Sequence, residues 1–187
     1  MRLILPKTFV DLDRYPRAPL FFIAGPILGG GDHQHDVCIL LGEKVPDCII
    51  ATPCRYTAQH PLYKYRMLGD EHHFHRQAAY ERYYLERAAK AKQEGRRGGA
   101  ILFNLSCESK TSPRKDGQPY GRDSYGELAE WRGQMMYDKA LNVLVAADPH
   151  FPGLDQISYN FSAALGYEFP IFGSVDELTD VAATMVD

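Results

Sequence analysis

Two glutamates, Glu81 and Glu127, have the residue type and the position that acid and base chemistry requires. Glu81 lies on one stripe of a predicted helix, whose members follow one another at spacings of 4, 3, 4 and 3: Phe74, Ala78, Glu81, Leu85 and Ala88. A carboxylate on an apolar stripe must accept a hydrogen bond, hold its proton to a higher pH, or face a cavity. Two structural alternatives stay open: an arginine (Arg55, Arg76 or Arg82) pairs with it, or the helix turns it toward water.

Glu127 follows a long polar loop over residues 106–123. Ser124-x-x-Glu127 matches a capping box, which by itself accounts for both residues. The same glutamate is also predicted in the first turn of a helix that follows a parallel strand, where doubly wound folds bind ligands. Two carboxyl groups at successive strand ends, one ionised and one protonated, are what the cleavage of a glycosidic bond needs.

Apolar segments alternate with helical ones along the chain. Strands are predicted over 20–26, 48–51, 99–105, 141–147 and 169–172, and helices over 34–44, 73–93, 124–139, 154–165 and from Ser174, where Ser174-x-x-Glu177 is a second capping-box pattern. This order predicts an α/β fold with five parallel strands and helices on both faces of the sheet. We expect residues 1–19 to be an irregular lead-in, and one domain over 1–187 with its core at about 20–183.

The composition of the chain indicates which partners and which cellular compartment to expect. The chain has 45% hydrophobic and 24% charged residues, a formal net charge of -3 and a pI of about 6.2, so no nucleic acid polymer is expected as a partner. Its four cysteines contain no C-x-x-C pair and are expected to be reduced. No segment has the length and hydrophobicity of a signal peptide or a membrane span, so we expect a cytoplasmic protein without a membrane partner.

Four short motifs occur in a characteristic order. They are Phe22-Ile23-Ala24-Gly25-Pro26 at the first predicted strand, Ala51-Thr52-Pro53-Cys54-Arg55 after the second, Gln77-x-x-Tyr80-Glu81 on the helix, and Gly126-Glu127-Leu128 after the loop. Together they resemble the nucleoside 2-deoxyribosyltransferase family, and more closely its divergent "nucleoside 2-deoxyribosyltransferase-like" branch. The resemblance covers Phe21 to about Asp180.

The resemblance implies a flavodoxin-like doubly wound sheet and an enzyme, either a nucleoside 2-deoxyribosyltransferase or a nucleoside or nucleotide N-glycosidase. Glu127 would be the nucleophile that forms a covalent glycosyl intermediate, Glu81 would exchange a proton with the base, and Asp123 would orient a sugar hydroxyl. The substrate would be a (deoxy)nucleoside or a nucleoside monophosphate. The resemblance also implies a homo-oligomer, and no cofactor is expected.

Further residues are candidates for substrate binding: Ala24, Gly25, Pro26, Arg55, Gln77, Tyr80, Arg122 and Ser124. The basic residues of the loop, Lys110, Arg114, Lys115 and Arg122, either bind a phosphate on the sugar or are simply solvated. The run Glu71-His72-His73-Phe74-His75 lacks a second pair of ligands, so no metal site is predicted. The alternatives to an enzyme are a non-catalytic sensor of a nucleotide-derived ligand and an interaction module on the same fold.

Overall fold

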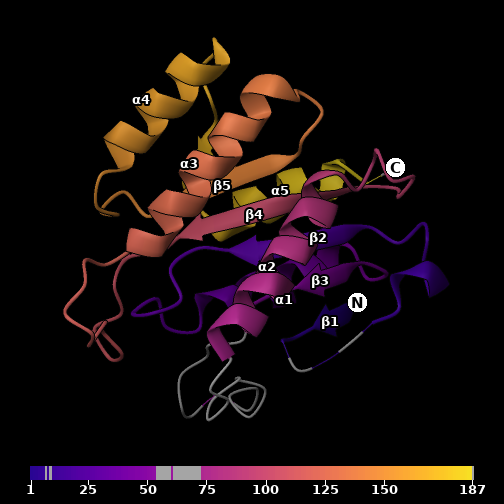
Figure 1. Ribbon diagram of the computed structural model, residues 1–187, viewed down its shortest axis with the longest axis horizontal. Helices are drawn as coiled ribbons and strands as arrows, with labels where there is room; N and C mark the ends of the chain where they lie inside the picture. The colour runs from indigo at the N-terminus through magenta and orange to yellow at the C-terminus, as the bar shows by residue number, and fades with distance from the viewer. Residues whose placement is uncertain (7, 9, 54–59, 61–72, 187) are drawn as a thin grey trace.

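The computed structural model describes residues 1–6, 8, 10–53, 60 and 73–186 (Figure 1). The described strands form one six-stranded parallel sheet in the order β1-β3-β2-β4-β5-β6. The strands are β1 (Arg2–Ile4), β2 (Leu20–Ala24), β3 (Ile49–Ala51), β4 (Gly99–Leu105), β5 (Val143–Ala147) and β6 (Ile171–Phe172). The helices are α1 (His33–Lys44), α2 (His73–Ala89), α3 (Arg122–Tyr137), α4 (Leu154–Leu165) and α5 (Val175–Thr184).

The predicted α/β class is confirmed, and so is the doubly wound order. The five strands from β2 to β6 follow the flavodoxin-like order 2-1-3-4-5 when they are numbered along the chain. The predicted count of five strands is wrong, because β1 pairs with the outer side of β3, from Arg2 opposite Ile49 to Ile4 opposite Ala51. A strand of three residues gives too short an apolar pattern to be recognised in the sequence.

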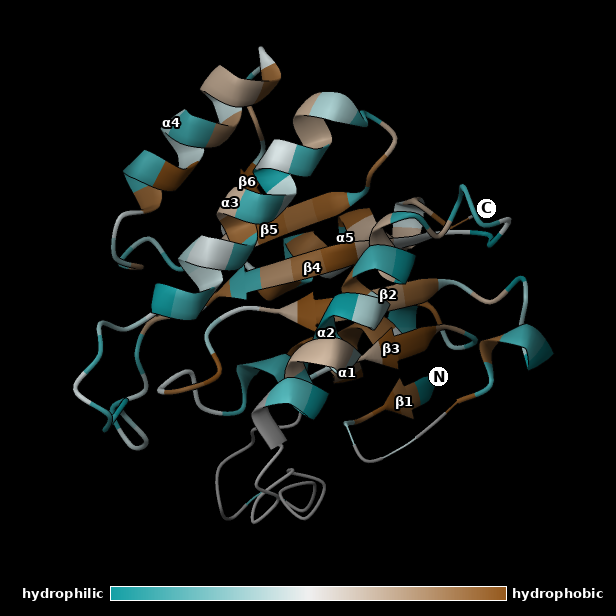
Figure 2. Cartoon of the chain, viewed as in Figure 1, coloured by the Kyte–Doolittle hydropathy of each residue, from teal (hydrophilic) through white to brown (hydrophobic). Residues whose placement is uncertain are grey.

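Helices cover both faces of the sheet, and successive strand residues point to opposite faces (Figure 1). Phe22 of β2 and Phe103 of β4 belong to the core beneath α2, α3 and α4. Phe21 and Leu102, their neighbours in the chain, belong to the core beneath α1 and α5. Every residue of β2 and β4 is buried, and Figure 2 shows the strands of the sheet mostly in the brown of hydrophobic residues.

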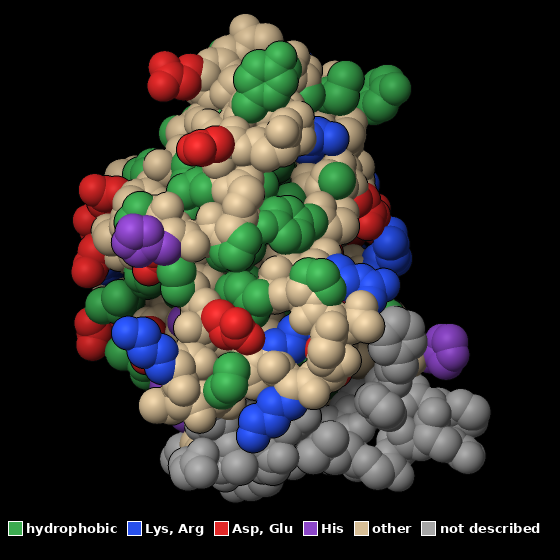
Figure 3. All heavy atoms as spheres, turned by 90° about the vertical axis from the view of Figure 1, so that its left-hand side faces the viewer, with side chains coloured by type: hydrophobic (Ala, Val, Ile, Leu, Met, Phe, Trp, Pro, Cys, Tyr) green, Lys and Arg blue, Asp and Glu red, His purple; other side chains and the backbone are tan. Residues whose placement is uncertain are grey.

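The loops that follow β2 and β4 emerge at the same end of the sheet, on the left in Figure 1. Figure 3 views this end directly and shows acidic and basic side chains close together on it. In doubly wound folds this is the end of the sheet that binds ligands.

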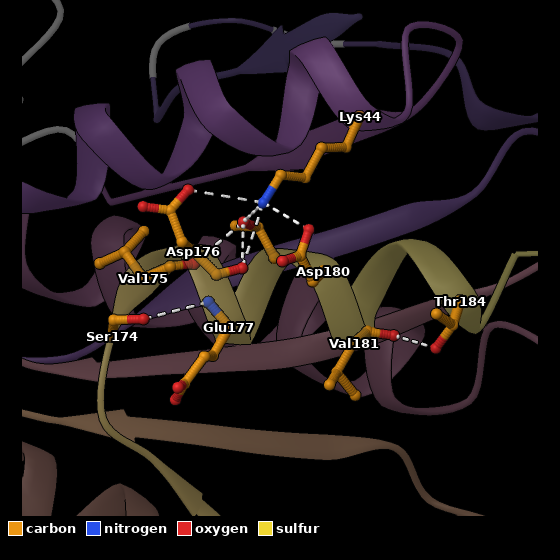
Figure 4. Close-up of polar contacts among 9 residues, drawn as sticks. Lys44, Ser174, Val175, Asp176, Glu177, Asp180, Val181 and Thr184 are labelled. Carbon is orange, nitrogen blue, oxygen red and sulfur yellow. Dashed lines mark hydrogen bonds and ion pairs between the residues drawn. The ribbon is translucent and has the colours of Figure 1, made fainter.

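Lys44 joins the end of α1 to the start of α5 (Figure 4). Its Nζ donates to Thr179 Oγ1 at 2.8 Å and forms ion pairs with Asp180 at 2.7 Å and Asp176 at 3.6 Å. These contacts raise the pKa of Lys44, chiefly through the hydrogen bond to Asp180. The cap predicted at the start of α5 is confirmed, since Ser174 Oγ accepts a hydrogen bond from the Glu177 backbone amide at 3.2 Å.

Within the described ranges, no helix is long and apolar enough to cross a membrane.

Candidate functional site

A cavity of about 440 Å³ lies at the carboxyl ends of β2 and β4. This is the topological switch point of the sheet, because the chain leaves β2 toward β3 on one side and later returns to β4 on the other. The lining comes from the turn after β2, from α2, from the loop after β4 and from the start of α3: Gly25, Pro26, Ile27, Leu28, Gln77, Ala78, Glu81, Arg114, Asp116, Gly121, Asp123, Ser124 and Glu127. The volume is within the range of small-molecule sites.

Glu81 of α2 and Glu127 of α3 both line this cavity. Both also line a second cavity of about 360 Å³ between α2 and α3, together with Trp131 and Gln134. Gln77 precedes Glu81 by one helical turn, and its Nε2 donates a hydrogen bond of 2.5 Å to Glu81 Oε1. Gln77 is buried, so this bond orients the Glu81 carboxylate with a side chain that has little freedom of its own.

The start of α3 differs from the prediction. Helix α3 begins at Arg122, and Gly121 precedes it in the left-handed conformation with a φ of 75°. The capping box predicted for Ser124 and Glu127 is therefore wrong: Ser124 is already the third helical residue, and Glu127 lies in the second turn instead of the first. A Cβ at Gly121 would lie 2.8 Å from Phe151 Cζ, so glycine is what allows the early start. Glu127 is left without a capping role, and its half-buried side chain reaches the cavity.

The electrostatic surroundings of Glu127 raise its pKa to about 8. Burial is the largest cause, and the nearby carboxylates of Glu81, Asp123 and Glu130 add to it. No described residue forms a hydrogen bond or an ion pair with the Glu127 carboxyl group. At pH 7 the group therefore holds its proton in the ligand-free protein.

Arg114, from the loop after β4, lines the cavity, and its side chain is only 7% exposed. The guanidinium donates to both carboxylate oxygens of Asp116, at 2.6 and 2.9 Å, and its Nη1 lies 3.6 Å from Asp123 Oδ2. These carboxylates raise the pKa of Arg114, with the hydrogen bond to Asp116 as the largest cause. Among the described lining residues, Arg114 is the one cation, and two acidic side chains already surround it.

The other basic residues of the loop do not line the cavity. Lys110 and Lys115 are exposed, and Arg122 Nη1 donates to Gln118 Oε1 at 2.7 Å. The structure thus brings Arg114 alone of these four side chains to the site.

The turn after β2 is fixed by two residues that the sequence analysis missed. His33 Nε2 donates to the Pro26 carbonyl at 2.9 Å, and Asn104 Nδ2 donates to His33 Nδ1 at 3.2 Å. Burial lowers the pKa of His33, which keeps the imidazole neutral and suited to accept from Asn104. Gly25 has a φ of 130°, and a Cβ there would lie 2.3 Å from the Asn104 carbonyl oxygen. Asn104 is itself a polar residue within the apolar run of β4, and this exception is the sequence signal that could have identified it.

The remaining candidates lie in different places. Gly25, Pro26, Gln77, Asp123 and Ser124 line the cavity with the two glutamates. Ala24 is buried at the end of β2 and does not line it. Tyr80 contacts the strand ends instead, because its hydroxyl donates to the Ile4 carbonyl at 2.8 Å and the Thr52 carbonyl at 3.1 Å.

Arg55 lies outside the described residues, as does the Glu71-His72 part of the histidine-rich run. In the part of the chain that the structure describes, no group of three or more His, Cys, Asp or Glu side chains is arranged to hold a metal ion.

No protein family model matches this chain, and none of the curated proteins matches it either. Its function must therefore be inferred from the site itself.

Proposed function

We propose that the chain cleaves or transfers the N-glycosidic bond of a (deoxy)nucleoside or nucleoside monophosphate, by a retaining mechanism with a glutamate nucleophile. The observation that carries the proposal is that Glu81 and Glu127, from two separate helices, line one cavity of about 440 Å³. A cavity of this size at the switch point of a doubly wound sheet is suited to a nucleoside. The resemblance to the nucleoside 2-deoxyribosyltransferase family agrees with this chemistry.

In the first step, a carboxylate oxygen of Glu127 forms a bond to C1′ of the sugar while the bond from C1′ to the base nitrogen breaks. The electron pair of the broken bond goes to the base, and the Glu81 carboxyl group supplies the proton that makes the base a good leaving group. In the second step, Glu81 takes a proton from water or from a second base, which attacks C1′ and releases Glu127. Two displacements at one carbon retain its configuration.

The neighbouring residues suit the same reaction. Asp123 and Ser124 line the cavity within one turn of Glu127 and can accept hydrogen bonds from sugar hydroxyls. Gly25 allows the backbone to come close to a ligand, since it has no side chain. Gln77 fixes the orientation of Glu81. The buried free thiols of Cys38 and Cys48 fit the proposed cytoplasmic location, and we include a homo-oligomeric assembly in the proposal on the resemblance.

The direct test is to incubate the protein with a panel of deoxynucleosides and their 5′-monophosphates and to measure released base, with and without a second base as acceptor. We expect release from at least one class and loss of release in Glu127→Ala. Glu168→Gln is the matched control, because Glu168 is exposed and lines neither cavity. Retained turnover in Glu127→Ala would remove the nucleophile from the proposal.

A 2-deoxy-2-fluoro-arabinosyl nucleoside gives an independent test, because its fluorine slows hydrolysis of the glycosyl ester. We expect intact-protein mass spectrometry to show one added glycosyl group, and peptide mapping to place it on Glu127. A label on Glu81 would exchange the roles of the two glutamates.

One observation favours a second candidate, a non-catalytic sensor of a nucleotide-derived ligand. With a pKa of about 8, Glu127 is mostly protonated at pH 7, and a protonated carboxyl group is a poor nucleophile. A sensor would gain thermal stability with a nucleotide while leaving every glycosidic bond of the panel intact, and an enzyme would release base.

A further inference from the structure

The charged side chains among the described lining residues of the cavity are mostly acidic. They comprise four carboxyl groups and one guanidinium: Glu81, Asp116, Asp123, Glu127 and Arg114. Asp116 engages Arg114 through both of its oxygens, and Asp123 adds a further ion pair. The positive charge of Arg114 is thus already paired with carboxylates within the protein, and a phosphate would compete with them for the guanidinium.

Further carboxylates lie between α2 and α3, on the other side of Glu127. The second cavity adds Glu86, which pairs with Lys90 at 2.7 Å, and Glu130, which engages Arg82 at 2.9 and 3.3 Å; Arg82 is the one basic side chain among the described residues of this lining. The described groups that act electrostatically on Glu127 are all carboxylates, and no described residue supplies it with a cation or a hydrogen bond. A positively charged ligand placed between the two helices would supply the missing counter-charge.

We propose, on the basis of the function proposed above, that the cavity selects N-glycosides whose nitrogen heterocycle carries a positive charge, such as N-ribosylated pyridinium compounds, over neutral nucleosides and nucleoside phosphates. In such a compound the positive ring nitrogen is bonded to C1′, so its charge lies beside the carbon that Glu127 attacks. Attraction between opposite charges is strong in a partly desolvated site, and a phosphate dianion would be repelled there.

The bond changes balance without an added proton in the first step. A carboxylate oxygen of Glu127 bonds to C1′, the bond between C1′ and the ring nitrogen breaks, and its electron pair neutralises the heterocycle. The positive substrate and the negative carboxylate thus become a neutral ester and a neutral base. Water then attacks C1′, Glu81 accepts its proton, and the Glu127 carboxylate is restored. Glu81 is needed as an acid only when the base departs from a neutral nucleoside.

A positive ligand also changes the ionisation of Glu127. In the ligand-free protein burial and three carboxylates hold the pKa of Glu127 near 8, and a cation beside it lowers that pKa. Binding of the cation therefore releases a proton and produces the carboxylate that attacks C1′. The selectivity for charge and the activation of the nucleophile have the same physical origin.

Binding is tested with a pair of ligands that cannot be cleaved, the cation 1-methylnicotinamide and neutral nicotinamide. We expect the cation to bind about tenfold more tightly by calorimetry. Titrations at pH 7.5 in two buffers of different ionisation enthalpy should show release of roughly half a proton per cation bound. Glu127→Gln should abolish both effects, and the control Glu168→Gln should keep them. Equal or tighter binding of the neutral amide would overturn the proposal.

Turnover is tested with nicotinamide riboside, its neutral 1,4-dihydro form and its 5′-monophosphate. We expect the cationic riboside to have the highest kcat/KM. With Glu81→Gln we expect one equivalent of nicotinamide to be released in a fast burst, followed by slow turnover, because Glu81 acts on this substrate only in the second step. Release from neutral nucleosides should lack the burst, since their first step also needs Glu81. Preference for the monophosphate would overturn the proposal.

The two proposals can fail separately. If the cation binds selectively with proton release but no glycoside is cleaved, the proposed function fails and the ligand class stands. If neutral nucleosides are cleaved and the cation is not favoured, the ligand class fails and the proposed function stands.

Discussion

Glu127 of α3 and Glu81 of α2 line the same two cavities, and the charge of Glu81 helps to raise the pKa of Glu127 to about 8. The two residues are brought together because α2 and α3 cover the same face of the sheet, on either side of the switch point. Coupled carboxyl groups of this kind are used where one must carry a proton and the other a charge.

The pH dependence of turnover distinguishes the roles of the pair. If Glu127 is the nucleophile, it must be ionised, so kcat/KM for a cationic N-glycoside, whose base leaves without a proton from Glu81, should rise with pH and level off above about 8. Glu81→Gln removes a negative charge beside Glu127, so the midpoint of the rise in kcat/KM should move to lower pH. The shift can be measured on the residual rate of the variant, or by titration of Glu127 in the NMR spectrum. A rate that falls above pH 8 would identify Glu127 as the acid.

Glu127→Gln should stabilise the ligand-free protein. Because the pKa of Glu127 is raised from 4.5 to about 8 on folding, the folded state binds the proton more tightly, and stability declines as the pH rises through this window. Glutamine cannot ionise and avoids that loss. At pH 8 we expect a gain of about 1–2 kcal/mol after allowance for solvent screening, or ~2–8 °C in Tm, and almost none at pH 4. Thermal unfolding at both pH values measures it, and a gain that is equal at both would assign the effect to packing.

His33 should make the fold sensitive to acid. Burial lowers the pKa of His33 on folding, so the unfolded chain binds more protons, and this contribution to stability is lost as the pH falls below the ordinary value of 6.5. Replacing His33 by Ala removes the hydrogen bonds to Pro26 and Asn104 and should cost roughly 1–2 kcal/mol at pH 7.5. The same variant should unfold with a shallower dependence on pH between 6.5 and 5. The free energy of unfolding is measured by denaturant titration at each pH. If it falls equally steeply with pH in the wild type and in the variant, His33 is not the source of the acid sensitivity.

The sequence predicted the framework of the site better than its details. The bounds predicted for β4 and α4 agree with the structure, because long apolar or periodic segments determine these elements locally. The early start of α3 depends on Gly121 packing against Phe151, a contact from beyond β5 that no local pattern contains. Arg114 reaches the cavity through the path of a loop, which its composition does not determine. The role of His33 depends on a contact with Asn104, far away in the chain.

The turn after β2 should not tolerate a side chain at Gly25. Gly25→Ala would combine an unfavourable φ of 130° with a Cβ only 2.3 Å from the Asn104 carbonyl oxygen, so the strand end or the turn must move. Gly95→Ala is a matched control, because Gly95 also has a positive φ, of 81°, but open space around its Cβ position. We expect the control to lose about 1 kcal/mol and Gly25→Ala to lose roughly 3 kcal/mol or more in urea unfolding.

Gly25→Ala should also weaken ligand binding, since Gly25 and Pro26 line the cavity and Gly95 does not. Calorimetry with 1-methylnicotinamide, at a temperature where both variants are folded, separates the two effects. Equal losses of stability in the two variants would mean that the turn can move away from β4, and that the close approach to Asn104 does not determine the position of this wall of the site.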